Sequence, residues 1–284
     1  MRAWPTRLRR AGPRRAPRWF PAVGLGVALL LGGGCERKDL GRTATAMAMD
    51  GNQGVRSSSN SLARQGRLEI RVRPPTVAGA GEGFVPLGEV AGGLLYVPAS
   101  YRAGQPAPLV VMLHGAGGDA RQSIGILREV ADERGLLLVA TKSRGSTWDI
   151  ILGDFGPDVA ALDQALAWVF ERYAVDPERV AIGGFSDGAS YALSLGLTNG
   201  ELFKHVLAFS PGFAAPAAQQ GTPRLFVSHG TRDAVLSIDA CSRRLVPRLQ
   251  RAGYEVLYHE FNGPHTVPDD ITREAVEWFV PAAK

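Results

Sequence analysis

The stretch Val180-Ala-Ile-Gly-Gly-Phe-Ser-Asp-Gly-Ala-Ser-Tyr191 decides the fold that we expect for this chain of 284 residues. Its first five residues have the composition of a buried strand, and the residues from Ala189 onward have that of a helix. Between them lies Gly184-Phe-Ser-Asp-Gly188, a Gly-x-Ser-x-Gly turn that leads from strand to helix. Flanking glycines let strand and helix approach closely, so that the Ser186 hydroxyl stands clear of the sheet. The pentapeptide alone is weak evidence, and the rest of the chain must support it.

Strands and helices alternate on both sides of this stretch. Strands are predicted at 93–97, 108–113, 136–140, 179–183, 205–209, 224–228 and 256–261, with an alternating edge strand at 68–72. Those at 108–113, 136–140 and 179–183 are expected to be buried. Helices are predicted at 121–134, 158–173, 189–195, 237–252 and 269–280, and 148–157 is expected to be a loop. This order predicts an α/β fold, in which a mostly parallel central sheet has helices on both faces. The gaps between elements are short, so no large lid domain is expected.

The N-terminal residues 1–35 have the pattern of an export signal. They hold seven arginines and no acidic residue, followed by an apolar run from Trp19 to Leu31 that is short for a membrane span. Small residues then precede Cys35, and this ending resembles a bacterial lipoprotein signal. The resemblance implies a lipidated Cys35 and a protein anchored in the bacterial cell envelope. Ordinary secretion and an uncleaved anchor are the alternatives.

Residues 36–66 are rich in Gly, Ser, Asn and Ala without apolar periodicity, which predicts a flexible linker. The catalytic domain is therefore expected at 67–284. Outside residues 1–35 the chain has 25 basic and 27 acidic residues, so the charge gives no indication of nucleic-acid binding. With Cys35 lipidated, only Cys241 remains, and it is expected to pack as a small apolar residue.

Polar residues follow several of the predicted strands at their carboxyl ends, where α/β sheets gather functional groups. A serine hydroxyl becomes a good nucleophile when an imidazole takes its proton, and a carboxylate orients that imidazole. Ser186, Asp233 and His265 occur in the chain order Ser, Asp, His, each after its own strand. Asp239 and His259 are rivals for the acid and the base, although they fall inside a predicted helix and a predicted strand.

The loop His114-Gly-Ala-Gly-Gly-Asp119 permits two functional interpretations, and a merely structural glycine turn is the third possibility. A His-Gly turn after this strand supplies an oxyanion-binding backbone N–H group in hydrolases. The same loop also matches the dinucleotide fingerprint Gly-x-Gly-x-x-Ala, with Lys142 and Arg144 after the next strand as ligands for a 2′-phosphate. The nucleotide interpretation explains none of the three residues Ser186, Asp233 and His265.

Taken together, the motifs from Leu94 to Phe279 resemble the α/β-hydrolase superfamily. The resemblance is to its phospholipase/carboxylesterase branch and to polyhydroxybutyrate-depolymerase-like and feruloyl-esterase-like proteins. The residues that carry it are Tyr96-Val-Pro98, Pro108-Leu-Val-Val-Met-Leu-His-Gly-Ala-Gly-Gly118, Gly184–Gly188, His229-Gly-Thr-Arg-Asp233 and Gly263-Pro-His265. It implies Ser186 as nucleophile, His265 as base, Asp233 as orienting acid, and the backbone N–H groups of Ala116 and Asp187 as the oxyanion hole. Asp187 departs from the branch, which often has Gln there.

The resulting expectation is a serine hydrolase that cleaves carboxylic esters through an acyl-enzyme. Trp148, Phe155 and Phe213 are candidates for binding the substrate. No cofactor is expected, and no metal, because no His, Asp or Glu cluster has ligand spacing. The expected partners are a small ester and, through Cys35, a membrane. The alternatives are a non-catalytic binding protein on the same fold and, with less support, a nucleotide-binding oxidoreductase.

Overall fold

The computed structural model describes residues 61–79 and 81–281, and the predicted signal with Cys35 lies outside them. Its helices are α2 (Ala120–Arg134), α3 (Asp149–Leu152), α4 (Pro157–Arg172), α5 (Asp187–Thr198), α6 (Ser242–Arg251) and α7 (Asp269–Phe279). Its strands are β1 (Gly83–Pro86), β2 (Leu94–Val97), β3 (Ala107–Leu113), β4 (Leu137–Ala140), β5 (Val175–Phe185), β6 (His205–Phe209), β7 (Arg224–Gly230) and β8 (Val256–Phe261).

The eight strands form one sheet in the order β1-β2-β4-β3-β5-β6-β7-β8. β1 and β2 are antiparallel to their neighbours, whereas all pairs from β4 to β8 are parallel. Strands β3 and β4 are buried along their whole length, because helices cover both faces. The mostly parallel α/β sheet predicted from the sequence is confirmed.

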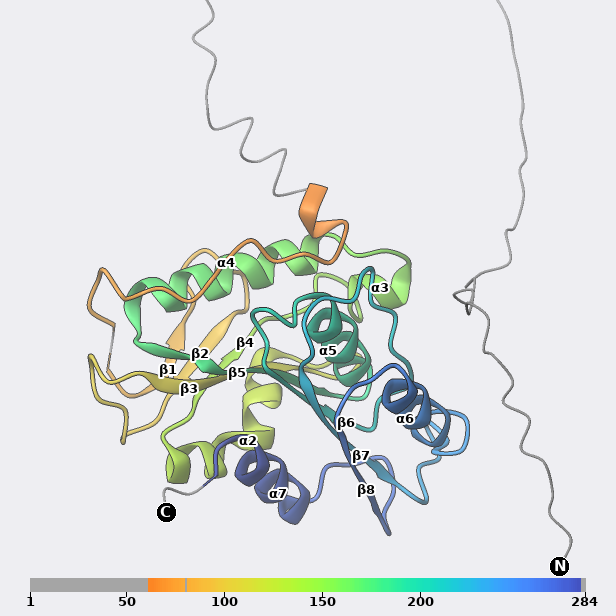
Figure 1. Ribbon diagram of the computed structural model, residues 1–284. Coiled ribbons are helices and arrows are strands. Elements are labelled where there is room, and N and C mark those ends of the chain that lie inside the picture. The colour runs from red at the N-terminus through yellow and green to blue at the C-terminus, as the bar shows by residue number, and fades with distance from the viewer. Residues whose placement is uncertain (1–60, 80, 282–284) are drawn as a thin grey trace, which may run out of the picture. The chain divides into compact units, whose positions relative to one another are not determined.

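Helices α4, α5 and α6 pack on one face of the sheet, and α2 and α7 pack on the other (Figure 1). Alternate residues of one strand therefore enter different cores. In β3, Leu109, Val111 and Leu113 face α4 and α5, while Val110 and Met112 face α2. All parallel strands end at the same edge of the sheet, and this edge carries the candidate site.

The segment predicted as an edge strand at 68–72 does not join the sheet. Its backbone N–H groups donate to side chains instead: Glu69 and Ile70 donate to the Asp163 carboxylate at 2.9 and 3.0 Å, and Leu68 donates to Asn199 Oδ1 at 2.9 Å. The alternating apolar residues pack against the core on the α4 side. The edge strand is β1, which the sequence analysis did not predict.

The domain also begins earlier than residue 67. Residues 61–66, which we assigned to the linker, form a helical turn with Ala63 buried in the core. The Asn199 amide donates to the Gly66 carbonyl at 2.7 Å and so ties this turn to the end of α5. The rest of the predicted linker lies outside the described residues.

Candidate active site

Ser186 occupies a strained turn between β5 and α5. Its φ of 57° and ψ of −121° are unfavourable for a residue with a Cβ atom. The turn requires glycine on both sides, because a Cβ on Gly188 would lie 2.2 Å from the Leu113 carbonyl oxygen. A Cβ on Gly184 would lie 2.5 Å from the Gly188 backbone. These contacts are the physical reason for the Gly-x-Ser-x-Gly pattern.

Three side chains from separate loops form one hydrogen-bonded chain at this edge. His265 Nε2 lies 2.9 Å from Ser186 Oγ, and His265 Nδ1 lies 2.5 Å from Asp233 Oδ2. Since a carboxylate only accepts hydrogen bonds, Nδ1 carries the proton and Nε2 is free to accept from the serine. The structure therefore brings together the three residues singled out in the sequence. The imidazole also packs on Phe185, with 4.6 Å between ring centroids.

The Asp233 carboxylate is held ionised by its neighbours. Burial acts to raise its pKa, but hydrogen bonds from His265 and from the backbone of Leu236 and Val235 outweigh burial and lower the pKa below its usual value. Oδ1 accepts the two backbone bonds at 2.8 and 2.9 Å, while Oδ2 faces His265. An ionised, fixed carboxylate suits the role of orienting an imidazole.

His229 is a second imidazole at this acid, and its ring is fully buried. Its Nε2 donates to the Leu236 carbonyl at 2.8 Å and lies 3.2 Å from Asp233 Oδ2, while Nδ1 accepts from the Ser242 hydroxyl at 2.7 Å. Burial lowers the pKa of His229, which keeps it neutral. This contact of His229 with Asp233 adds a residue to the three singled out in the sequence.

The loops of the acid and the base are bonded to one another. Thr231 donates its N–H to the Phe261 carbonyl at 2.8 Å, and Arg232 donates to the Gly263 carbonyl at 2.9 Å. Gly230 permits this approach, because a Cβ there would lie 2.4 Å from the Gly263 and Pro264 carbonyl oxygens. The separation of Asp233 and His265 is therefore set by backbone contacts.

The predicted oxyanion loop lies against the elbow. A Cβ on Gly115 would lie 3.4 Å from the Ser186 Cβ, so the loop passes beside the serine. Within the described chain, the N–H groups of Ala116 and Asp187 have no hydrogen-bond acceptor. The Asp187 carboxylate accepts the Thr147 hydroxyl at 2.6 Å, which fixes the side-chain direction that the sequence left open.

The rival assignments do not fit this geometry. Asp239 is exposed and pairs with Arg243 at 2.9 Å. His259 lies on β8 and pairs with Glu274 of α7 at 2.8 Å. For a dinucleotide, the helix N-terminus after the glycine loop would have to bind a diphosphate. Here the Asp119 carboxylate already accepts the Gln122 N–H and caps α2, which places a negative charge where the diphosphate would lie.

Two of the three predicted substrate-binding aromatics belong to the core. Trp148 is 1% exposed, donates its indole N–H to the His114 carbonyl at 2.8 Å and stacks on Tyr191. Phe155 is 8% exposed and packs against the same tyrosine. We therefore correct both assignments: these rings support the site from beneath. Phe213 is 36% exposed and remains a candidate.

The loop that carries Phe213 rests on hydroxyl groups of α5. Ser190 Oγ accepts the Gly212 N–H and Ser194 Oγ accepts the Ala215 N–H, each at 2.9 Å. Each serine hydroxyl also donates to the carbonyl four residues earlier in the helix. Neither Ser190 nor Thr147 was expected from the sequence, because the candidate residues were those that follow the strands and not the groups that face them.

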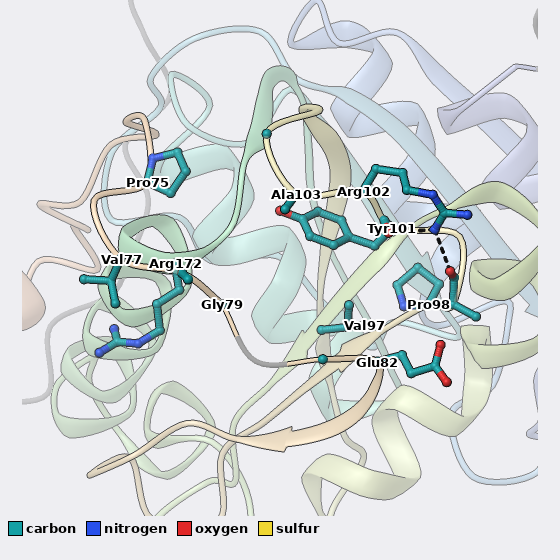
Figure 2. A pocket seen from close by; sticks show the side chains of 14 residues that line it. Pro75, Val77, Gly79, Glu82, Val97, Pro98, Tyr101, Arg102, Ala103 and Arg172 are labelled. Atoms are coloured by element: carbon teal, nitrogen blue, oxygen red, sulfur yellow. Dashed lines mark hydrogen bonds between the residues drawn. The ribbon is translucent and has the colours of Figure 1, made fainter.

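One cavity in the described part of the chain lies away from the triad. It has a volume of about 480 Å³ and is lined by residues that include Tyr101, Arg102 and Arg172 (Figure 2). Arg172 ends α4, and Val97 ends β2 beside the first residues of β4, so the cavity lies at the amino ends of the parallel strands. A smaller hollow of about 290 Å³ adjoins Thr147 and Leu152 on the triad side.

Residues 61–79 and 81–281 contain no group of three or more His, Cys, Asp or Glu side chains placed to bind a metal ion. None of the helices in this part of the chain is both long and apolar enough to cross a membrane.

Comparison with known proteins finds similarity to esterases. The model of a family described as putative esterase matches residues 161–244, which include the elbow and Asp233. An acetylxylan esterase of Coprinopsis cinerea is 27% identical over 173 residues, which cover 45% of this chain and 46% of the relative. A probable feruloyl esterase C of Aspergillus oryzae is 27% identical over 156 residues, covering 51% and 56%. The chain thus spans about half the length of the curated relatives it matches.

Solved esterase structures share the fold. Esterase PE8 superposes with a TM-score of 0.52 at 23% identity, covering 74% of this chain and 98% of that one. Esterase 2 of Thermogutta terrifontis, solved with propionate, gives a TM-score of 0.56 at 18% identity, covering 72% and 97%. The chain has the α/β-hydrolase fold of these esterases, and the family model and the relatives that it matches are those of esterases.

Proposed function

We propose that this protein is a serine hydrolase that cleaves carboxylic esters through an acyl-enzyme. The observation that carries the proposal is the continuous hydrogen-bonded chain from Ser186 Oγ through His265 to Asp233. A buried ionised acid, an imidazole in a single tautomer and a strained serine at the edge of the sheet are the parts that acyl transfer needs.

In the first step His265 Nε2 takes the hydroxyl proton as Ser186 Oγ attacks the ester carbonyl carbon. The imidazolium that forms is stabilised by Asp233, which stays ionised. The carbonyl oxygen becomes an oxyanion, and the N–H groups of Ala116 and Asp187 are the donors we assign to it.

In the second step the carbon–oxygen bond to the alcohol breaks, and His265 gives its proton to the departing alcohol. Water then enters, loses a proton to His265 Nε2 and attacks the acyl-enzyme. The acid leaves, and Ser186 recovers its proton. The geometry supports each proton transfer, because the same nitrogen faces the serine throughout.

For the substrate we infer esters with a small or accessible acyl group. Phe213, Val235 and Leu152 are exposed apolar side chains in the segments that follow β6, β7 and β4, and they offer apolar contacts at this end of the sheet. The matched relatives are named for acetyl and feruloyl esters. A panel of aryl esters from acetate to decanoate, together with methyl ferulate, tests this inference, and a preference for decanoate would contradict it.

Labelling with a fluorophosphonate tests the central proposal. We expect one covalent adduct on the peptide that contains Ser186, and we expect Ser186→Ala to lower p-nitrophenyl ester turnover by several orders of magnitude. Asp239→Asn is the control, because this exposed carboxylate pairs only with Arg243. A folded wild-type protein that neither labels nor turns over esters would instead be a binding protein on this fold.

We also propose that the protein is exported and lipid-anchored through Cys35, which rests on the sequence pattern alone. Expression in a bacterial host with a radiolabelled fatty acid tests the anchor. The wild type should carry label and sediment with membranes, whereas Cys35→Ala should lose the label. Equal recovery of both in the soluble fraction would contradict the anchor.

A further inference from the structure

The loop between β4 and α3 contacts, through residues 143–148, the segments that carry both halves of the oxyanion hole that we assign. We call it the β4–α3 loop. Four hydrogen bonds join it to residues 114–117 and to Asp187. They are Ser143 N–H to His114 Nε2 at 3.0 Å, Gly117 N–H to Ser146 O at 2.7 Å, Trp148 Nε1–H to His114 O at 2.8 Å and Thr147 Oγ1–H to Asp187 Oδ2 at 2.6 Å.

The last of these bonds bears directly on the chemistry. Asp187 follows the serine in sequence, and its N–H group is one of the two assigned to the oxyanion. Its carboxylate lies at the first residue of α5, where the helix dipole favours a negative charge. The same charge would repel an oxyanion formed at that N–H group. The direction of the Asp187 side chain therefore decides whether its charge can stabilise the helix N-terminus without also destabilising the oxyanion.

Thr147 supplies a donor that fixes this direction. Its side chain is buried, with 7% of the residue exposed, and the bond of 2.6 Å has the length of a charge-assisted hydrogen bond between a hydroxyl and a carboxylate. We propose that Thr147 is a positioning residue for the ester hydrolysis proposed above: its hydroxyl holds the Asp187 carboxylate on the β4–α3 loop and keeps that charge at a fixed distance from the oxyanion. The inference rests on the proposed function, because it concerns the same reaction.

The expected size of the effect follows from the charge. A carboxylate about 6 Å from an oxyanion, at an effective dielectric constant of about 20, would slow the reaction by about a hundredfold. Without the Thr147 hydroxyl, the Asp187 side chain would spend only part of its time in that position near the oxyanion. We therefore expect Thr147→Val to lower kcat about tenfold. KM should stay within about twofold, because the oxyanion forms after the substrate has bound.

The experiment uses p-nitrophenyl butyrate and four variants of the full chain. Thr147→Val removes the hydroxyl at nearly constant volume, and Thr147→Ser keeps it and should restore kcat to within about twofold of the wild type. Asp187→Ala removes the carboxylate and retains the N–H group. Adding Thr147→Val to Asp187→Ala should change kcat by less than twofold, because no charge remains to be held.

A matched control separates positioning from stability. Thr272 in α7 is also buried, and its hydroxyl donates to the Asp269 carbonyl at 2.8 Å. Thr272→Val is the same chemical change outside the site, and it should lower the melting temperature without lowering kcat.

Three results would overturn the inference: full kcat in Thr147→Val, an equal loss in the Asp187→Ala background, or no recovery in Thr147→Ser. A wild type that neither labels with a fluorophosphonate nor turns over esters overturns the proposed function and this inference with it. An active wild type with an unaffected Thr147→Val variant overturns the inference alone.

Discussion

Replacing Asp233 with asparagine would exchange one oxygen for an NH2 group in a site surrounded by hydrogen-bond donors. The carboxylate faces the ring nitrogens of His265 and His229 on one side and the backbone N–H groups of Val235 and Leu236 on the other. An amide has one acceptor oxygen, so either orientation turns its own N–H bonds toward other donors.

The two orientations have different costs. If the amide oxygen turns to His265, two buried backbone N–H groups lose their acceptor, at about 1–3 kcal/mol each. If it stays with the backbone, His265 must move its proton from Nδ1 to Nε2, and Nε2 then cannot accept from Ser186. The wrong tautomer in a Ser-His-Asp triad costs about 10⁴ in kcat. We therefore expect kcat to fall about 10³- to 10⁴-fold, or about 4–5.5 kcal/mol in the activation free energy.

The assay is steady-state hydrolysis of p-nitrophenyl butyrate, with the folded fraction of each variant measured by thermal unfolding. Asp239→Asn is the control and should stay within about twofold of the wild type, because its ion pair with Arg243 is exposed. A folded Asp233→Asn variant that keeps more than a tenth of wild-type kcat would refute the reasoning. Loss of activity in Asp239→Asn would reassign the acid.

Three further predictions concern stability. Gly188→Ala places a Cβ 2.2 Å from the Leu113 carbonyl oxygen, so urea unfolding should show a loss of more than about 3 kcal/mol; near-normal stability would mean that the elbow is looser than described. Burial, with the charge of Arg224 second, lowers the pKa of His205 to about 4, below its unfolded value of 6.5, so folding stability should fall as pH drops from about 6.5 to about 4. In His205→Phe the loss of stability over this pH range should be smaller by about 1–2 kcal/mol, a value that allows for partial solvent screening. Urea unfolding at several pH values measures it, and an equal loss of stability in the variant and the wild type would contradict the prediction. Asn199→Ala removes the bonds to Gly66 and Leu68, so it should cost about 2–3 kcal/mol and open residues 61–70 to limited proteolysis with kcat unchanged; a loss of kcat at full stability would contradict this role.

The sequence was sufficient where local pattern and topology agree. The apolar runs of β3 and β4 have the right length for buried strands. Because parallel strands end at one edge, Ser186, Asp233 and His265 were expected to meet there. The contacts between them, by contrast, are properties of the folded loops.

The remaining features depend on contacts between distant residues. Residues 68–72 alternate as a strand would, but their N–H groups bind Asp163 and Asn199, more than 90 residues away. Trp148 has a large aromatic side chain of the kind that often lines a pocket. Only the folded loop shows that its indole N–H donates to the His114 carbonyl. Thr147 likewise meets Asp187 across 40 residues, which no periodicity reveals.

The serine hydroxyls of α5 matter for any attempt to change the substrate specificity of this protein. The loop that carries Phe213 donates the Gly212 and Ala215 N–H groups to the hydroxyls of Ser190 and Ser194, which belong to the helix that begins directly after Ser186. Loop and helix therefore form one module for grafting. A substrate-facing loop transplanted from a relative will lack its anchor unless the matching face of the helix is transplanted with it, so specificity is best exchanged as the whole segment from the elbow to the end of that loop.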